Sequence, residues 1–218
     1  MGRPHTALLD QDKIAEAALA LIDERGDFTM PELARRLHVQ AASLYHHVDG
    51  RSGVVELLRE HISTRAYESP PAQGHGWEAA MRDLCHNYRA QFAAHPHLVP
   101  LLTRQPVRGP KALAAYEKMV VLMEQAGFPL SMVMAALTAI ENFLIGAALD
   151  LSAPESMWEV TPDLPLPRLQ AALAAQPTDR RPADQAYEFG LDLILEGCRR
   201  FLEHSGRSPQ TIAGPAGA

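Results

Sequence analysis

The chain is poor in cysteine, aromatic residues and positive charge, and each scarcity excludes a class of protein. Its two cysteines, Cys85 and Cys198, lie far apart within predicted helices, which is typical of buried thiols in a reducing cytoplasm and not of a disulfide framework. The net charge of −6 argues against a protein that coats nucleic acid along its whole length, so such binding would need a local patch. No segment alternates apolar and polar residues over the length of a strand, while alanine and leucine are abundant, which predicts an all-α fold.

Neither a secretion signal nor a membrane span is expected from the apolar pattern. The first residues, MGRPHTALLDQDK, have no apolar core of the needed length. The most apolar run, 132–149, carries Glu141 and Asn142 near its middle, and both side chains would be costly in lipid. We therefore expect a cytoplasmic protein without membrane partners, in which this run lies in a core or a subunit interface.

Helix signals and one Pro/Gly-rich stretch at 68–76 divide the chain into two predicted units. The first, 1–66, contains a flexible arm over residues 1–9, helices at 10–25, 29–37 and 41–48, and a linking helix at 52–67. The second, 67–204, contains helices at 77–94, 98–104, 111–125, 130–151, 169–175 and 183–203, with a loop at 153–167. A disordered tail is expected over 205–218.

The first unit presents a polar helix between helices that bury its back. Thr29 and Glu32 have the spacing of a capping box, and residues 38–40 read as a turn. On the following helix Leu44 and Val48 face inward, which favours a helix-turn-helix motif. The polar side chains of this segment are suited to contact phosphates and base edges, and so is a cation just beyond the helix. These residues are Gln40, Ser43, Tyr45, His46 and His47, followed by Arg51.

The positive charge of this unit is thin. Residues 1–66 carry eight Lys and Arg against ten Asp and Glu, a net of −2, although 33–48 holds two Arg, three His and no acid. Affinity for DNA should therefore be modest without dimerisation and should fall steeply with salt. An ordinary three-helix unit with solvated polar residues remains the alternative at this point.

The string LARRLHVQAASLYHHVDGRSGVVELL closely resembles the DNA-binding segment of the tetracycline-repressor (TetR) family. The shared order is a Leu-Ala pair, a small-residue turn, a Leu-Tyr pair and a basic residue opening the next helix. The resemblance covers roughly residues 10–66 and implies a homodimeric regulator on a palindromic double-stranded DNA operator. Pro31 and Asp49 depart from the pattern, so the operator sequence does not carry over. The resemblance implies base contacts by Ala41, Ala42, Ser43 and Tyr45 and phosphate contacts by Thr29, Tyr45, His47 and Arg51.

The second unit is similar to the tetracycline-repressor branch, which implies a ligand-binding and dimerisation domain. The positions that chelate the drug and its metal in that branch hold Tyr67, Leu84 and Pro100, while Thr103 is retained. We therefore expect no magnesium chelate and no cofactor, but a hydrophobic or aromatic small-molecule effector. The predicted pocket residues are mainly apolar and aromatic: Tyr67, Leu84, Tyr88, Phe92, Leu98, Leu102, Thr103, Tyr116, Met119, Met123, Met134, Leu137 and Asn142.

The helices at 130–151 and 183–203 have more apolar surface than one chain needs. Pairing with their copies would build a four-helix interface about a two-fold axis, and Gly190 and Gly197 would permit close approach. The same axis would set two recognition helices about 34–36 Å apart, one turn of DNA.

Three other readings remain open beside a ligand-responsive repressor. An enzyme is disfavoured, because no nucleophile–base pair, glycine-rich phosphate loop or Glu-x-x-His pair is visible. A metal-responsive regulator could use Cys85, His86, His95 and His97, although their spacing is not a standard ligand pattern. A ligand-independent DNA-binding protein would instead have a fully packed second unit.

Overall fold

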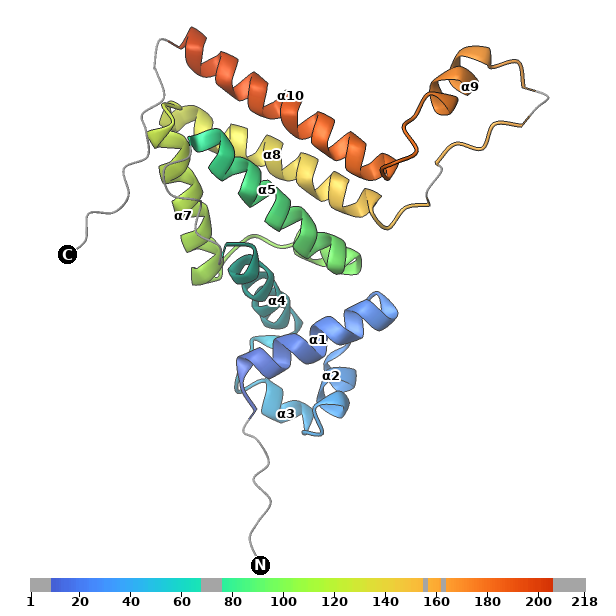
Figure 1. Cartoon of the computed structure of the whole chain (residues 1–218). Helices are drawn as coiled ribbons and strands as arrows, with labels where there is room; N and C mark the ends of the chain where they lie inside the picture. Colours follow the sequence, from blue (N-terminus) through green and yellow to red (C-terminus); the bar gives the residue numbers. More distant parts are fainter. Residues whose placement is uncertain (1–8, 68–75, 155–156, 162–163, 206–218) are drawn as a thin grey trace, which may run out of the picture.

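The computed structural model describes residues 9–67, 76–154, 157–161 and 164–205, and the side chains of 65–67 are not described. Within these ranges the regular structure is entirely helical, so the predicted all-α fold is confirmed (Figure 1). The predictions for the arm at 1–9, the 68–76 boundary and the tail at 205–218 lie almost wholly outside the described residues. The helices are α1 (Gln11–Arg25), α2 (Met30–Arg36), α3 (Ala41–Leu44), α4 (Gly50–Tyr67), α5 (Trp77–Ala94), the 3-10 helix η1 (Pro96–Leu98), α6 (Val99–Leu102), α7 (Pro110–Gln125), α8 (Leu130–Asp150), α9 (Pro167–Ala174) and α10 (Pro182–His204).

The ends of α1 and α2 follow directly from the sequence. The Lys13 amide donates to the Asp10 carboxylate over 2.8 Å, and Gly26 ends α1 at φ 81°, where a residue without Cβ is favoured. At α2 the predicted capping box is confirmed. The Thr29 amide donates to Glu32 Oε2 over 2.9 Å, and the Glu32 amide donates back to Thr29 Oγ1 over 3.4 Å.

The third helix is shorter than predicted. Regular α-helix ends at Leu44, not Val48, and the residues after it form turns. The amides of His47 and Val48 still bond to the Leu44 carbonyl, at 2.9 and 3.0 Å, so the chain stays coiled until Gly50 breaks it at φ 59°. Tyrosine and histidine are weak helix formers. Of the three residues after Leu44, Tyr45 and His46 are exposed and His47 is half-buried, so burial does little to extend the helix.

Two clusters of buried side chains make up the core. The first joins α1–α4 to η1 and α6, and includes Leu33, Leu44, Leu58 and Leu98. The second joins α5, α7, α8 and α10, with Met81, Met123 and Tyr187 among its most buried side chains. Because α4 contributes to the first cluster and lies against α5 and α7, it connects the two halves of the molecule (Figure 1).

Helix α8 is buried on one side only within the single chain. Val133, Leu137, Ile140 and Leu144 face the core, while 28% of its most apolar window is buried. Among the described residues it is the one helix long and apolar enough to cross a membrane, and core helices of soluble proteins pass the same test. Figure 1 shows α10 running alongside α8, so the two exposed sides can form a continuous surface.

Gly190 has a different role from the one predicted. A Cβ placed on it would lie 2.5 Å from Phe143 Cε2, so this glycine lets α10 approach α8 within the same chain. A Cβ on Gly197 would meet no atom within 4 Å, and that position faces open space in the single chain.

Candidate nucleic-acid interface and ligand cavity

The α2–turn–α3 segment presents polar side chains outward, while Leu44 and Val48 anchor its back. Tyr45 is 58% exposed, and its ring lies over Gly50, with Cε1 3.8 Å from where a Cβ would stand. His46 is exposed, and His47 is half-buried. The other predicted contact residues lie on the same segment, where Gln40 and Ala42 are exposed and Ala41 and Ser43 are half-buried. The geometry is that of a short projecting turn suited to a groove.

Two of the predicted phosphate contacts are already engaged. The Thr29 hydroxyl donates to Glu32 Oε2 over 2.7 Å as part of the capping box. Arg51 does not project outward as expected, because its guanidinium donates to the Phe28 carbonyl and, over 2.7 Å, to Asp27 Oδ1. It also lies 4.6 Å above the Phe28 ring. Arg51 therefore holds the α1–α2 turn against α4, and could reach a phosphate only by exchanging partners.

Other cations of this unit are also paired with acids, although their side chains stay at the surface. Burial disfavours the charged form of Asp27, but hydrogen bonds from Arg51 and the Phe28 amide outweigh it and lower the pKa of Asp27. Arg35 on α2 is exposed and has no ion pair with another described residue, so sequence reasoning overlooked an available cation. The cations of this unit that pair with acids are Lys13 with Asp10, Arg25 with Glu32, Arg36 with Glu24 and Arg51 with Asp27.

Tyr45→Ala is expected to weaken DNA binding about tenfold or more, because an exposed ring and hydroxyl suited to phosphate and thymine methyl contact are removed. The free energy of unfolding should change by less than about 0.5 kcal/mol, since the side chain is mostly exposed. Titration of labelled duplex and thermal melting measure the two effects. Tyr45→Phe is the matched control, because it keeps the ring and removes only the hydroxyl. Unchanged affinity in Tyr45→Ala would refute the assignment.

Two adjoining cavities lie in the second unit. Both are small; one is almost wholly apolar, and the other borders α4. They share Tyr88 from α5, Tyr116 from α7 and Glu141 from α8, which therefore stand between them. Of the predicted pocket residues, those that line a cavity are Leu84, Tyr88, Phe92, Leu102, Tyr116, Met119 and Leu137.

Other predicted pocket residues lie elsewhere. Met134 is 53% exposed, and Asn142 and Thr103 are also exposed, because these positions turn away from the cavities. Leu98 and Met123 are fully buried and fill the two core clusters instead. The side chain of the predicted Tyr67 lies outside the described residues.

The strongest polar feature of the cavities was missed. Glu141 Oε1 accepts hydrogen bonds from Tyr88 Oη over 2.8 Å and from Tyr116 Oη over 2.7 Å. Burial, and then the Glu141 charge, raise the pKa of Tyr116, so its phenol stays protonated and donates. An acid inside an otherwise apolar helix was a usable signal, since such residues mark functional sites. The remaining lining residues not predicted are Arg59, Ser63, Met81, Ala112, Ile140 and Leu144.

Charged side chains of α4 bind the connection between α6 and α7. Arg59 Nη2 donates to the carbonyls of Leu102 and Gln105, over 2.7 and 3.0 Å. Glu56 Oε1 accepts from the Gly109 amide over 2.6 Å. The cation thus meets the carbonyl that ends α6 and another three residues beyond it, and the carboxylate meets amides at the start of α7, which matches the dipole of α7.

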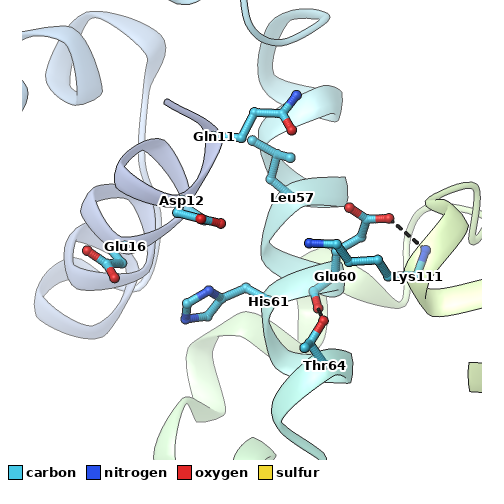
Figure 2. Close-up of a pocket in the computed structure, with 9 residues that line it drawn as sticks. Gln11, Asp12, Glu16, Leu57, Glu60, His61, Thr64 and Lys111 are labelled. Atoms are coloured by element: carbon cyan, nitrogen blue, oxygen red, sulfur yellow. Dashed lines mark hydrogen bonds between the residues drawn. The ribbon is translucent and has the colours of Figure 1, made fainter. Parts of the chain in front are cut away.

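Glu60 adds a second contact to the start of α7, beside an open crevice between α1, α4 and α7. Figure 2 shows Glu60 reaching the Lys111 amide, a bond of 3.0 Å. Asp12 and Glu16 of α1 and His61 of α4 line the same crevice. Helix α4 is therefore tightly joined to α7, while an open crevice lies between α1 and α7.

Comparison with known proteins identifies the family. Residues 70–202 match the family description "Tetracyclin repressor-like, C-terminal domain". The chain belongs to the tetracycline-repressor family. This TetR-family chain is 33% identical over 153 residues to an HTH-type transcriptional regulator of Saccharopolyspora erythraea, covering 69% of this chain and 63% of that regulator. The TetR family consists of transcriptional regulators and not of enzymes, as predicted.

Two further relatives span more of the TetR-family chain. The class D tetracycline repressor of Escherichia coli is 27% identical over 198 residues, covering 88% of this chain and 89% of the repressor. The crystal structure of the TetR-family protein ActR from Streptomyces coelicolor, in complex with actinorhodin, superposes with a TM-score of 0.74 at 24% identity, covering 89% and 97% of the two chains. The latter match shows a shared fold, including the helix-turn-helix unit and the larger helical domain.

The cysteines and histidines considered for metal binding do not come together in this TetR-family chain. Within the part of the chain that the structure describes, no group of three or more His, Cys, Asp or Glu side chains is arranged to hold a metal. Burial raises the pKa of Cys85 to about 12, which keeps it a thiol. His95 pairs with Asp23 at 2.9 Å, and His86 lies beside the Tyr187 ring.

Proposed function

We propose that this TetR-family chain is a homodimeric repressor that leaves its DNA operator when a small hydrophobic or aromatic molecule binds. The observation that carries the proposal is the path of α4. One end of this helix packs behind the exposed α2–α3 segment, and the middle lines a cavity and holds the α6–α7 connection through Arg59 and Glu56. A change in the cavity would therefore reach the helix-turn-helix motif directly.

The second copy in the proposal is supported by the exposed faces of α8 and α10. We define the outer face as the following large apolar side chains of α8 and α10, which are exposed in the single chain: Leu130, Met132, Met134, Leu149, Phe189 and Leu193. Monomeric proteins rarely leave so many large apolar side chains on neighbouring helices uncovered. A two-fold axis through this face would produce a four-helix interface and orient two recognition segments toward successive major grooves, about 34–36 Å apart.

The small-molecule effector is supported by the cavity lining and by what relatives are named for. One relative is named a tetracycline repressor, and another has been crystallised with actinorhodin. In this chain the Met, Leu and Tyr side chains would suit a hydrophobic guest, and Leu84 occupies a place where the resemblance implies a chelating side chain. Binding would release DNA only if the effector prefers the conformation that cannot bind the operator.

In this proposal the protein binds DNA in the cytoplasm. Residues 1–66 form the DNA-binding domain, and residues 67–204 form the ligand-binding and dimerisation domain. Pairing of cations with acids leaves few positive charges on the first domain, so the dimer would depend on two weak half-site contacts acting together.

A mobility-shift titration with the DNA upstream of the protein's own gene tests the proposal. We expect one retarded species with dimer stoichiometry and an affinity that falls linearly with salt on logarithmic axes. The matched control is a duplex of the same length and composition with a shuffled sequence. A folded dimer that binds neither duplex at low salt, or both equally, would contradict the proposed function.

A further inference from the structure

The carboxylate of Glu141 lies between two small cavities, and a guest larger than either would have to displace the groups that separate them. We name Tyr88, Tyr116 and Glu141 the partition, because these residues line both cavities and bond to one another across them. They come from α5, α7 and α8, so the partition is a tertiary feature and not a local motif.

The charge of the partition is uncompensated. Glu141 receives both phenolic hydroxyls on Oε1, and it forms no ion pair with a described residue. The cation that shares the second cavity, Arg59, pairs with Glu56 at 3.5 Å and donates to two carbonyls. A carboxylate surrounded by Met, Leu and Ile side chains strongly favours a cation, since charge interactions are strengthened where water is scarce.

The cation beside the partition is already engaged. Arg59 Nε makes no hydrogen bond in the described structure, but it lies 3.5 Å from Glu56 Oε2 in an ion pair, and Nη2 donates to two carbonyls. Glu141 is therefore the charged group that a guest in these cavities would engage.

We propose that the partition selects cationic aromatic effectors, whose ammonium or amidinium group replaces the two phenolic hydroxyls on Glu141. The aromatic body would then lie along the apolar walls beside Glu141. A neutral hydrocarbon of the same shape is rejected, because it separates the tyrosines from Glu141 and gives the carboxylate no donor in return. This assignment deepens the proposed function and rests on it.

Direct binding to the full-length dimer tests the selectivity with two probes of matched shape. The probes are 9-aminoacridine, which is cationic at neutral pH, and acridine, the same ring system in neutral form. We expect the unmodified protein to bind 9-aminoacridine about tenfold or more tightly than acridine, the size of effect of one charge-assisted hydrogen bond. Glu141→Gln keeps the shape of the side chain and should abolish this preference.

The control variant is Glu117→Gln, which makes the same change at an exposed position on α7 and should retain the preference. A double variant, Tyr88→Phe with Tyr116→Phe, should bind 9-aminoacridine more tightly, because Glu141 no longer has hydroxyls to exchange. A purely structural role for the tyrosines would instead weaken binding in that variant.

Retention of the preference in Glu141→Gln, weaker binding in the double variant, or no binding of 9-aminoacridine up to about 1 mM would each overturn the proposal. The DNA titration described above is run on the same preparations. Specific DNA binding without cation selectivity would refute the partition alone, whereas selectivity without DNA binding would refute the proposed function and leave the partition standing.

Discussion

Leu193→Glu is expected to yield a folded monomer that has lost measurable affinity for its operator. Leu193 is 57% exposed on α10, and it lies one helical turn from Phe189, which is 68% exposed. In a two-fold interface each glutamate would be buried near its copy or against apolar side chains of α8, and an unpaired buried charge costs several kcal/mol. Within one chain the substitution should cost little, because the side chain has few neighbours to lose.

We expect the dimer dissociation constant to rise by more than about 100-fold, since 1.4 kcal/mol corresponds to a factor of ten. Operator affinity should fall at least as far, because the paired half-site contacts become independent. Sedimentation velocity and the DNA titration measure the two constants. Leu113→Glu is the matched control, because Leu113 is 48% exposed on α7, outside the outer face. An intact Leu193→Glu dimer would refute the interface.

The second large effect is expected from Arg59→Met, which should lower the free energy of unfolding by about 2 kcal/mol and the melting temperature by roughly 4–8 °C. The Arg59 side chain is 13% exposed, and that of its partner Glu56 is 18% exposed. Methionine retains most of the volume but leaves this carboxylate without its cation and two carbonyls at the end of α6 without their donor.

Arg59→Met should also weaken communication between the cavity and DNA, because α4 would lose its bonds to the carbonyls of Leu102 and Gln105 in the α6–α7 connection. We expect Arg59→Met to have a small effect on the operator affinity of the effector-free dimer. Its larger effect should be on the factor by which the effector lowers that affinity. Arg82→Met is the control, since Arg82 pairs with Asp192 at 2.5 Å in an exposed ion pair worth less than about 0.5 kcal/mol. Equal destabilisation by both variants would show that α4 gains nothing special from Arg59.

Local features were predictable because their causes lie within a few residues. The Asp10 cap, the Gly26 stop and the Thr29–Glu32 capping box depend on short-range hydrogen bonds and on one backbone conformation. Trp77–Ala94 has the bounds expected for α5 from its apolar period and from the proline after it. The length of α3 was overestimated, because weak helix formers after Leu44 gain little from packing.

The site was predictable only in part. Periodicity identified several apolar residues of the cavities, because the cavity side of α5, α7 and α8 is also their buried side. The same signal could not separate lining from core, so Met123 was assigned to the cavity although it packs in the core. Periodicity also could not distinguish residues that line a cavity from apolar residues on the outer face, which is why Met134 was wrongly predicted to line the pocket.

The sequence by itself determined that the chain is helical, where its main helices begin and end, and which short segment resembles a TetR-family DNA-binding motif. These properties depend on side-chain period, capping and turn residues close together in the chain. Only the tertiary structure decided the partners of charged groups: Arg51 with Asp27, and Glu141 with two tyrosines from other helices. Coulomb and hydrogen-bond energies depend on distances between residues far apart in sequence, and those distances exist only once the helices have packed.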